Sequence, residues 1–257
     1  MRVGCSHQKA LGLNPNFEAV CLFMNCEMMD SIRQRILNIQ NDLPPSVTLI
    51  AVSKTKPEEM IEDAFEEAGQ RHFGENRVQE LVRKAENLPA DCIWHAIGHL
   101  QRNKVKQVIP HVAWIHAVDS HRLLDEVQRR AAESLTAGLR EAPVQVLLQV
   151  HIAQEEAKFG LTHDECERWV DSGDLESLEG VVVRGLMGMA TFTDDERQVG
   201  REFKGLRALY ERLEKGRSQF DTLSMGMSGD WPIAVDEGST MIRVGSAIFG
   251  ARKAPSP

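Results

Sequence analysis

The sequence has little of several features that mark particular classes of protein. Its five cysteines form no CxxC pair or other metal-ligand spacing, and their odd number and scatter favour a reducing cytoplasm over a disulfide scaffold. No apolar run approaches the roughly 20 residues that cross a bilayer. Lysine and arginine number 30 against 38 acidic residues, so the net charge of −8 gives no general attraction for nucleic acid. We therefore predict a cytoplasmic protein that binds no metal, membrane or nucleic acid.

The first 27 residues differ from the rest of the chain. They hold three of the five cysteines and show no sustained hydrophobic period. Their apolar stretch, AVCLFM, is too short and lies too far from the start for a signal peptide. We predict that residues 1–27 are a disordered extension or follow from a misassigned start, and that one domain spans residues 28–257.

The remaining chain alternates short apolar runs with amphipathic stretches. The run VTLIAVS (Val47–Ser53) is rich in β-branched residues and is typical of a strand covered on both faces, as in a parallel sheet. Between such runs, apolar residues recur at helical spacing, for example Val199, Phe203 and Leu206. Eight strands are predicted, at the start of 92–104 and within 47–53, 71–76, 113–120, 144–152, 180–189, 222–228 and 241–250.

This alternation predicts the fold. Parallel neighbours need crossover connections, which the helices supply. The length also falls within the usual range for a barrel of eight strand–helix units. We predict an α/β protein with a single (β/α)₈ TIM barrel. An open, doubly wound sheet is the main alternative.

Lys54 is the first candidate functional residue. It stands at the carboxyl end of the first strand, where functional groups gather in such a barrel. Burial lowers the pKa of an amine, and a lysine that follows a nearly apolar strand is therefore a plausible Schiff-base former. The alternative interpretation is a lysine whose charged end reaches into water.

The last two strand–helix turns suggest a site for an anion. LSMGMSGD and MIRVGSAIFG combine glycines, which let backbone N–H groups approach an anion closely, with serines, which add donors. In barrels of this kind the last two loops often form a phosphate pocket. We predict that Ser228, Gly245 and Ser246 grip a phosphate. An aldehyde for the lysine and a phosphate for these turns together describe pyridoxal 5′-phosphate.

Arg243 lies inside the last apolar strand, where an arginine is costly unless it is paired or hydrogen-bonded. One interpretation is a structural ion pair with a nearby carboxylate. The functional one places its guanidinium against the pyridine nitrogen of the cofactor, where a permanently charged donor keeps that nitrogen unprotonated and weakens the ring as an electron sink.

Other polar residues carry less information. Glu75, Asn76 and His99 fall at or just past strand ends. A histidine within a strand, such as His95, is more often a core residue with satisfied hydrogen bonds than a catalyst. His116 has no partner at ligand spacing, and no metal site is predicted.

Seven motifs of the sequence, taken in order, resemble one family. They are AVSKTKP, FGENRVQE, WHAIGHLQRNK, KFGL, GLMGMA, LSMGMSGD and GSTMIRVGSAIFGAR. Together they resemble the pyridoxal phosphate homeostasis proteins, the YggS/PROSC family, over roughly Met28–Arg252. The resemblance implies a barrel like the N-terminal domain of alanine racemase, with pyridoxal 5′-phosphate held as an internal aldimine. It also implies a protein that binds, buffers or delivers this cofactor, with no established turnover.

The resemblance assigns roles to particular residues and leaves none as catalytic. It implies that possible partners are apo-enzymes that accept the cofactor. The N-terminal extension has no counterpart in the family pattern. The cofactor-binding residues it implies are Lys54 as the aldimine lysine, Arg243 at the pyridine nitrogen, Ser228, Gly245 and Ser246 at the phosphate, and Gly226 and Asn76 nearby.

Two other functions stay open from the sequence. One is an amino-acid racemase that uses pyridoxal 5′-phosphate, which needs a second acid/base on the opposite face of the ring. The only tyrosine, Tyr210, is predicted to lie in the middle of a helix, which leaves a histidine or Cys92 for that role. The other is a barrel lyase whose Lys54 reacts directly with a sugar phosphate. A single barrel without an obvious apolar patch is expected to be a monomer.

Overall fold

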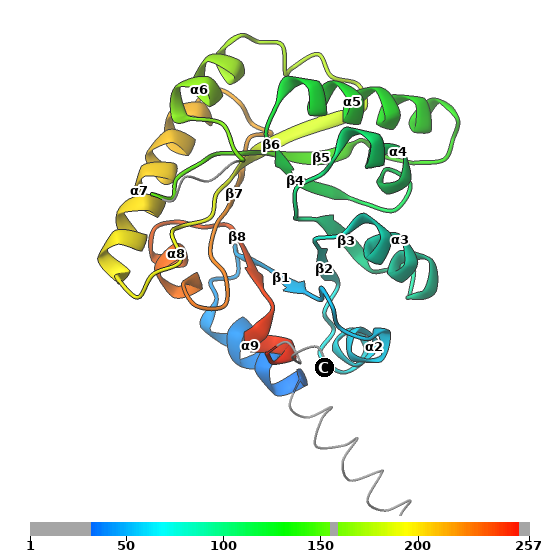
Figure 1. Cartoon of the computed structure of the whole chain (residues 1–257), viewed down its shortest axis with the longest axis vertical. Helices are drawn as coiled ribbons and strands as arrows, with labels where there is room; N and C mark the ends of the chain where they lie inside the picture. The colour runs from blue at the N-terminus through cyan, green and yellow to red at the C-terminus, as the bar shows by residue number, and fades with distance from the viewer. Residues whose placement is uncertain (1–31, 155–158, 252–257) are drawn as a thin grey trace, which may run out of the picture.

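Eight parallel strands close into a barrel in the order of the sequence (Figure 1). The computed structural model describes residues 32–154 and 159–251, so the extension predicted for residues 1–27 lies outside the described residues. Each strand pairs with the next, and the eighth pairs with the first. The predicted TIM barrel is confirmed, and the open doubly wound sheet is excluded.

All eight strands lie within the predicted runs, and helices connect them. Near the beginning, residues 32–42 are helical. The strands are β1 (Thr48–Val52), β2 (His72–Glu75), β3 (Ile93–Ala96), β4 (Trp114–Val118), β5 (Val144–Gln149), β6 (Val181–Met187), β7 (Thr222–Ser224) and β8 (Met241–Val244). The helices are α2 (Glu58–Glu67), α3 (Val78–Asn87), the short 3-10 turn η1 (Arg102–Lys104), α4 (Val105–Val108), α5 (His121–Thr136), α6 (His163–Asp171), α7 (Glu196–Leu213), α8 (Trp231–Asp236) and α9 (Ser246–Phe249).

The ring closes where the two ends of the barrel domain meet. Strand β8 pairs with β1, with Ile50 opposite Arg243. Outside this seam, the helical residues 32–42 lie beside α9 (Figure 1), and Nη1 of Arg35 donates to the carbonyl oxygen of Ile248 at 3.1 Å. The seam therefore brings the turn after the first strand next to the turn after the last one. No helix within the described ranges is long and apolar enough to span a bilayer.

Alternation along the strands divides the core into two layers. Most apolar side chains point outward and pack against the helices, as Phe73, Trp94 and Ile115 do. The inward positions hold a small apolar cluster that includes Ile50 and Leu147. They also hold buried polar side chains, which are rare inside proteins and need hydrogen-bond partners.

Gly185 allows β6 to pass close to β7. Its φ of +146° is one that side chains rarely adopt, and a Cβ there would lie 1.8 Å from the carbonyl oxygen of Thr222. The register between β5 and β6 shifts at the same level. Only glycine fits this position, because a side chain there would collide with the backbone of Thr222.

Candidate functional site

The residues predicted to bind a cofactor lie at one part of the barrel mouth. They belong to the carboxyl ends of β7, β8, β1 and β2, which are consecutive in the closed sheet. Because all the strands are parallel, these ends lie on one face of the barrel. Gly226 and Ser228 follow β7, Arg243 lies in β8, Gly245 and Ser246 follow β8, Lys54 lies in the turn after β1, and Asn76 follows β2.

Arg243 points into the barrel, where it is 4% exposed. Its Nη1 donates to Oγ of Ser224 at 2.6 Å, and its Nη2 donates to the carbonyl oxygen of Gly188 at 3.0 Å. Both partners are neutral, and burial lowers the pKa of the guanidinium to about 10, a shift that the charge of Asp230 opposes. No carboxylate in the described part of the chain forms an ion pair with it, so the interpretation of Arg243 as half of a structural ion pair is not supported there. Among the described residues, the groups that accept hydrogen bonds from this buried cation are neutral.

The last two turns meet at the hydroxyl group of Ser228. Its Oγ accepts hydrogen bonds from the backbone N–H groups of Gly245, at 3.1 Å, and Ala247, at 3.4 Å. Gly226 has a φ of +96°, which a residue with a side chain rarely adopts, and this allows the turn of the backbone there. Its carbonyl oxygen accepts a hydrogen bond from the N–H of Arg243, which ties this turn to β8. These contacts place an oxygen atom where backbone N–H groups of the turn after β8 converge.

Both neighbours of Lys54 are held by charged side chains. Ser53 is buried, and its Oγ donates to Oε1 of Glu75 at 2.7 Å. On the other side, Thr55 has a φ of +64°, which is strained for a β-branched residue. Its N–H donates to Oε1 of Glu80 at 2.6 Å. The turn that presents Lys54, which is half-buried, is therefore fixed from two sides.

Lys84 of α3 joins these two glutamates. Its side chain is fully buried, and Nζ donates to Oε1 of Glu75 at 2.6 Å, to Oε1 of Glu80 at 2.8 Å and to the carbonyl oxygen of Ser53 at 2.8 Å. Burial raises the pKa of the Glu75 carboxyl, and hydrogen bonds and charge from Lys84 oppose that rise. Oε2 of Glu75 is buried without a hydrogen-bond partner. Sequence analysis pointed to Glu75 but missed Lys84, Glu80 and the strain at Thr55.

Three histidines form hydrogen bonds across the inside of the barrel. Nδ1 of His72 lies 3.0 Å from Nε2 of His95, and Nδ1 of His95 lies 3.0 Å from Nε2 of His116. Nδ1 of His116 lies 3.3 Å from Oγ of Ser224. The interpretation of His95 as a buried histidine with satisfied hydrogen bonds is confirmed. It lies inside β3 and not at the strand end.

Comparisons with known proteins show which family the chain belongs to. A family model described as "Alanine racemase, N-terminal domain" matches residues 28–253. The pyridoxal phosphate homeostasis protein of Vibrio alginolyticus is 40% identical over 239 residues, which cover 87% of this chain and 99% of that protein. The chain belongs to the pyridoxal phosphate homeostasis protein family.

Solved structures of similar proteins extend this assignment. PipY of Synechococcus elongatus, solved with PLP bound, is 39% identical, with a TM-score of 0.75 over 85% of this chain and all of PipY. The alanine racemase of E. faecalis has a TM-score of 0.66 at 17% identity, over 87% of this chain and 58% of the racemase. The racemase likeness shows the fold alone, and this family shares the barrel.

Two residues considered as a second acid/base lie away from the mouth. Cys92 comes just before β3, at the amino end of the barrel, and burial raises the pKa of its thiol to about 11. Tyr210 is buried on α7, and its hydroxyl group donates to the carbonyl oxygen of Phe220 at 3.3 Å, before β7. The suggestion that Cys92 could serve the opposite face of a cofactor at the mouth is therefore wrong.

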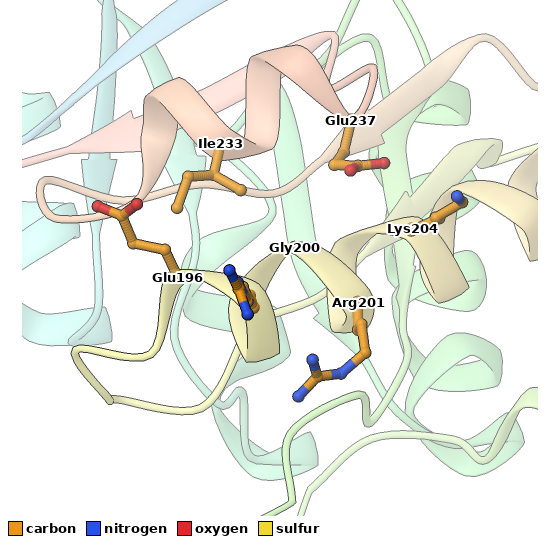
Figure 2. Close-up of a pocket in the computed structure, with 7 residues that line it drawn as sticks. Glu196, Gly200, Arg201, Lys204, Ile233 and Glu237 are labelled. Carbon is orange, nitrogen blue, oxygen red and sulfur yellow. The ribbon is translucent and has the colours of Figure 1, made fainter.

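A groove of about 550 Å³ lies on the outer wall, between α7 and α8 (Figure 2). Arg201 and Lys204 of α7 line it together with Glu237, so its charge is mixed. None of the residues predicted to bind the cofactor lines this groove. Within residues 32–154 and 159–251, no group of three or more histidine, cysteine, aspartate or glutamate side chains could hold a metal ion.

The buried histidines are expected to make the protein less stable below pH 6.5. Burial holds the pKa values of His95 and His116 well below their ordinary value of 6.5. The unfolded chain takes up protons on both rings as the pH falls through 6.5, while the folded chain does not. Well below pH 6.5, the free energy of unfolding should therefore fall by about 1.4 kcal/mol per pH unit for each ring until the folded rings also take up protons, and this contribution is fully present only above 6.5.

Urea unfolding between about pH 7.5 and about pH 5.5 measures this slope. In His95→Gln, which removes one titrating ring, the mean slope over this range should be smaller by about 0.7 kcal/mol per pH unit, because the unfolded ring is only half protonated at pH 6.5. The raised pKa of Glu75 has the opposite effect on stability as the pH falls, because the folded chain then binds the extra proton. This effect is the same in the wild type and in His95→Gln, so it does not alter the difference between them. Equal slopes in the two proteins would contradict the assignment.

Proposed function

We propose that this chain binds pyridoxal 5′-phosphate covalently through Lys54 and buffers or delivers it in the cytoplasm without catalytic turnover. The observation that carries the proposal is the buried Arg243, whose partners are neutral. A desolvated guanidinium favours a further acceptor, and the pyridine nitrogen of the cofactor is one. The same donor discourages protonation of that nitrogen, which weakens the ring as an electron sink.

The other end of the cofactor also finds suitable groups. The N–H groups of Gly245 and Ala247 point at one oxygen, that of Ser228. We propose that the oxygen atoms of the phosphate lie beside this hydroxyl group. They accept hydrogen bonds from backbone N–H groups of the same turn, including that of Ser246. Gly226 and Asn76 lie at the adjoining strand ends and are assigned to the wall of the site.

Lys54 supplies the amine between these two ends. When bound, the cofactor contributes an aldehyde that an amine can attack. The charged groups on both sides hold the backbone of this turn, so the amine needs little rearrangement. We propose that residues 28–257 form the binding domain and that it acts as a monomer, with apo-enzymes as acceptors.

The absence of turnover is part of the proposal. A racemase needs an acid/base on each face of the ring. Tyr210 and Cys92 lie away from the barrel mouth in the described structure. The histidines of β3 and β4 are committed to hydrogen bonds with each other inside the barrel.

The test is a titration of the purified protein with pyridoxal 5′-phosphate. We expect a visible absorption band, which borohydride abolishes, and a pyridoxyl group that peptide mapping places on Lys54. The loaded protein should activate an apo-enzyme that depends on the cofactor, and incubation with alanine enantiomers should give no racemisation. Steady racemisation by the loaded protein would replace this proposal with the racemase function, and label on another lysine would contradict the site.

A further inference from the structure

A chain of buried polar groups runs through the barrel from one face to the other. It starts at Arg243 in β8 and passes through Ser224 at the end of β7. It continues through His116 in β4 and His95 in β3, and ends at His72, the first residue of β2. Arg243, Ser224, His116 and His95 are buried, whereas His72 is partly exposed. The chain therefore links the predicted cofactor site to the amino-end face.

The chemistry of Arg243 sets the direction of this chain. A guanidinium only donates hydrogen bonds, so Oγ of Ser224 accepts from Nη1. Ser224 is fully buried, and its own hydroxyl hydrogen needs an acceptor. In the described structure the other hydrogen-bond contact of Oγ is Nδ1 of His116, at 3.3 Å. Ser224 therefore donates to Nδ1 of His116.

The tautomers of the histidines follow from this first bond. Since Nδ1 of His116 accepts, its hydrogen is on Nε2 and is donated to Nδ1 of His95. His95 in turn donates from Nε2 to Nδ1 of His72. The reverse direction would leave the hydroxyl hydrogen of Ser224 buried and unpaired, at a cost of about 1–3 kcal/mol. All three rings are neutral in this arrangement, and burial lowers the pKa of each one.

Packing holds the middle of the chain in place. The ring of His95 stacks on Trp114, with centroids 5.7 Å apart and planes 12° from parallel. His116 meets His95 nearly edge-on. Because this stacking and the hydrogen bonds along the chain hold the rings, the acceptor of the Ser224 hydroxyl hydrogen stays in place, and Ser224 has little freedom to move away from Arg243.

We propose that Ser224, His116 and His95 are positioning residues that hold the guanidinium of Arg243 in one orientation. With Nη1 fixed by Ser224 and Nη2 fixed by Gly188, the plane of the guanidinium is set, and so is the direction of its remaining N–H groups. The effect on the cofactor rests on the proposed function, in which Arg243 faces the pyridine nitrogen. The direction of the hydrogen-bond chain from Arg243 to His72 does not depend on the proposed function.

The first experiment tests the chain without cofactor. Nitrogen-15 NMR of histidine-labelled wild-type protein at neutral pH reports the tautomer and charge of each ring. We expect neutral Nε2–H tautomers for His95 and His116. An Nδ1–H tautomer or a charged ring at either position would overturn the chain. No variant has to fold for this test.

The second experiment tests the effect on the cofactor. Ser224→Ala removes the acceptor of Nη1, and Ser134→Ala is the matched control, because Ser134 is also buried but its Oγ has no hydrogen-bond partner. We expect Ser224→Ala to lower affinity for pyridoxal 5′-phosphate about tenfold. Ring-labelled cofactor should show a shift of its pyridine nitrogen toward the protonated state. The control should change neither quantity.

The outcomes separate this inference from the proposed function. Unchanged affinity and an unchanged ring nitrogen in Ser224→Ala would overturn the positioning role, even if the wild type binds cofactor on Lys54. A loss of folding stability alone in Ser224→Ala would also overturn it, since a structural role predicts that result. If the wild type binds no cofactor, the proposed function fails. The NMR spectrum still decides whether the histidines form the one-directional hydrogen-bond chain.

Discussion

Alanine in place of Lys54 is expected to abolish the visible absorption band of bound pyridoxal 5′-phosphate and to weaken its binding at least about 100-fold. The variant loses the only covalent attachment in the proposed site. The contacts proposed for Arg243 and the turn after β8 remain, so some non-covalent binding should persist. Spectral titration gives the first quantity, and equilibrium dialysis gives the second.

Lys56→Ala is the matched control. Lys56 lies two residues further along the same turn, but its Nζ donates to the carbonyl oxygens of Phe249 and Gly250. This variant should lose stability, because those carbonyl groups lose a charged donor, and it should keep the absorption band. A band that survives in Lys54→Ala would mean that Lys54 does not carry the cofactor, and a band lost in both variants would mean that its loss does not report on the amine of Lys54.

The positions of the strands could be predicted from the sequence because each strand is a short apolar run. A parallel strand covered on both faces, such as β1, shows a nearly continuous series of β-branched residues. Closure into a barrel followed from the count of such units and their length. The exact ends could not be predicted, because hydrogen bonds to neighbouring strands decide them. The run predicted at 144–152, for example, ends as β5 at Gln149.

The surroundings of Lys54 were harder to predict, because the residues that hold it come from a different element. Lys84 and Glu80 look like an ordinary ion pair at i, i+4 on a helix surface. The position of Lys84 in its helix could have revealed that its side chain is buried. Lys84 is three residues after Leu81 and four before Leu88, so it lies on the buried face of α3. A lysine on an apolar face needs a buried acceptor.

The histidine chain was also present in the sequence as a pattern. His72, His95 and His116 lie in successive strands, and their neighbours Phe73, Trp94 and Ile115 point outward into the helical layer. Alternation therefore sends all three rings into the barrel. What the sequence could not supply was the relative height of the strands, which decides whether the rings touch. The direction of the chain depends further on Arg243, which approaches from the far side of the barrel.

Replacing Lys84 by methionine is expected to lower the free energy of unfolding by about 3–5 kcal/mol, the typical cost of removing one partner from a buried ion pair. Lys84 is fully buried, and its ammonium group is the charged partner of both Glu75 and Glu80. Without it, Glu75 keeps a buried carboxyl group in which Oε2 already has no partner. The melting temperature should fall by about 10 °C. Chemical and thermal unfolding measure both values.

Two further variants show whether the loss comes from the unpaired charge. Lys204→Met removes an exposed lysine of α7 and should change stability by less than about 0.5 kcal/mol. Adding Glu75→Gln to Lys84→Met removes the unpaired carboxylate and should recover part of the loss, because the cost of Lys84→Met lies mainly in the charge it leaves behind. If the double variant is as unstable as the sum of the two single ones, Glu75 and Lys84 do not act as a pair. The turn of Lys54 would then owe its shape to packing and to the hydrogen bond that Thr55 donates to Glu80.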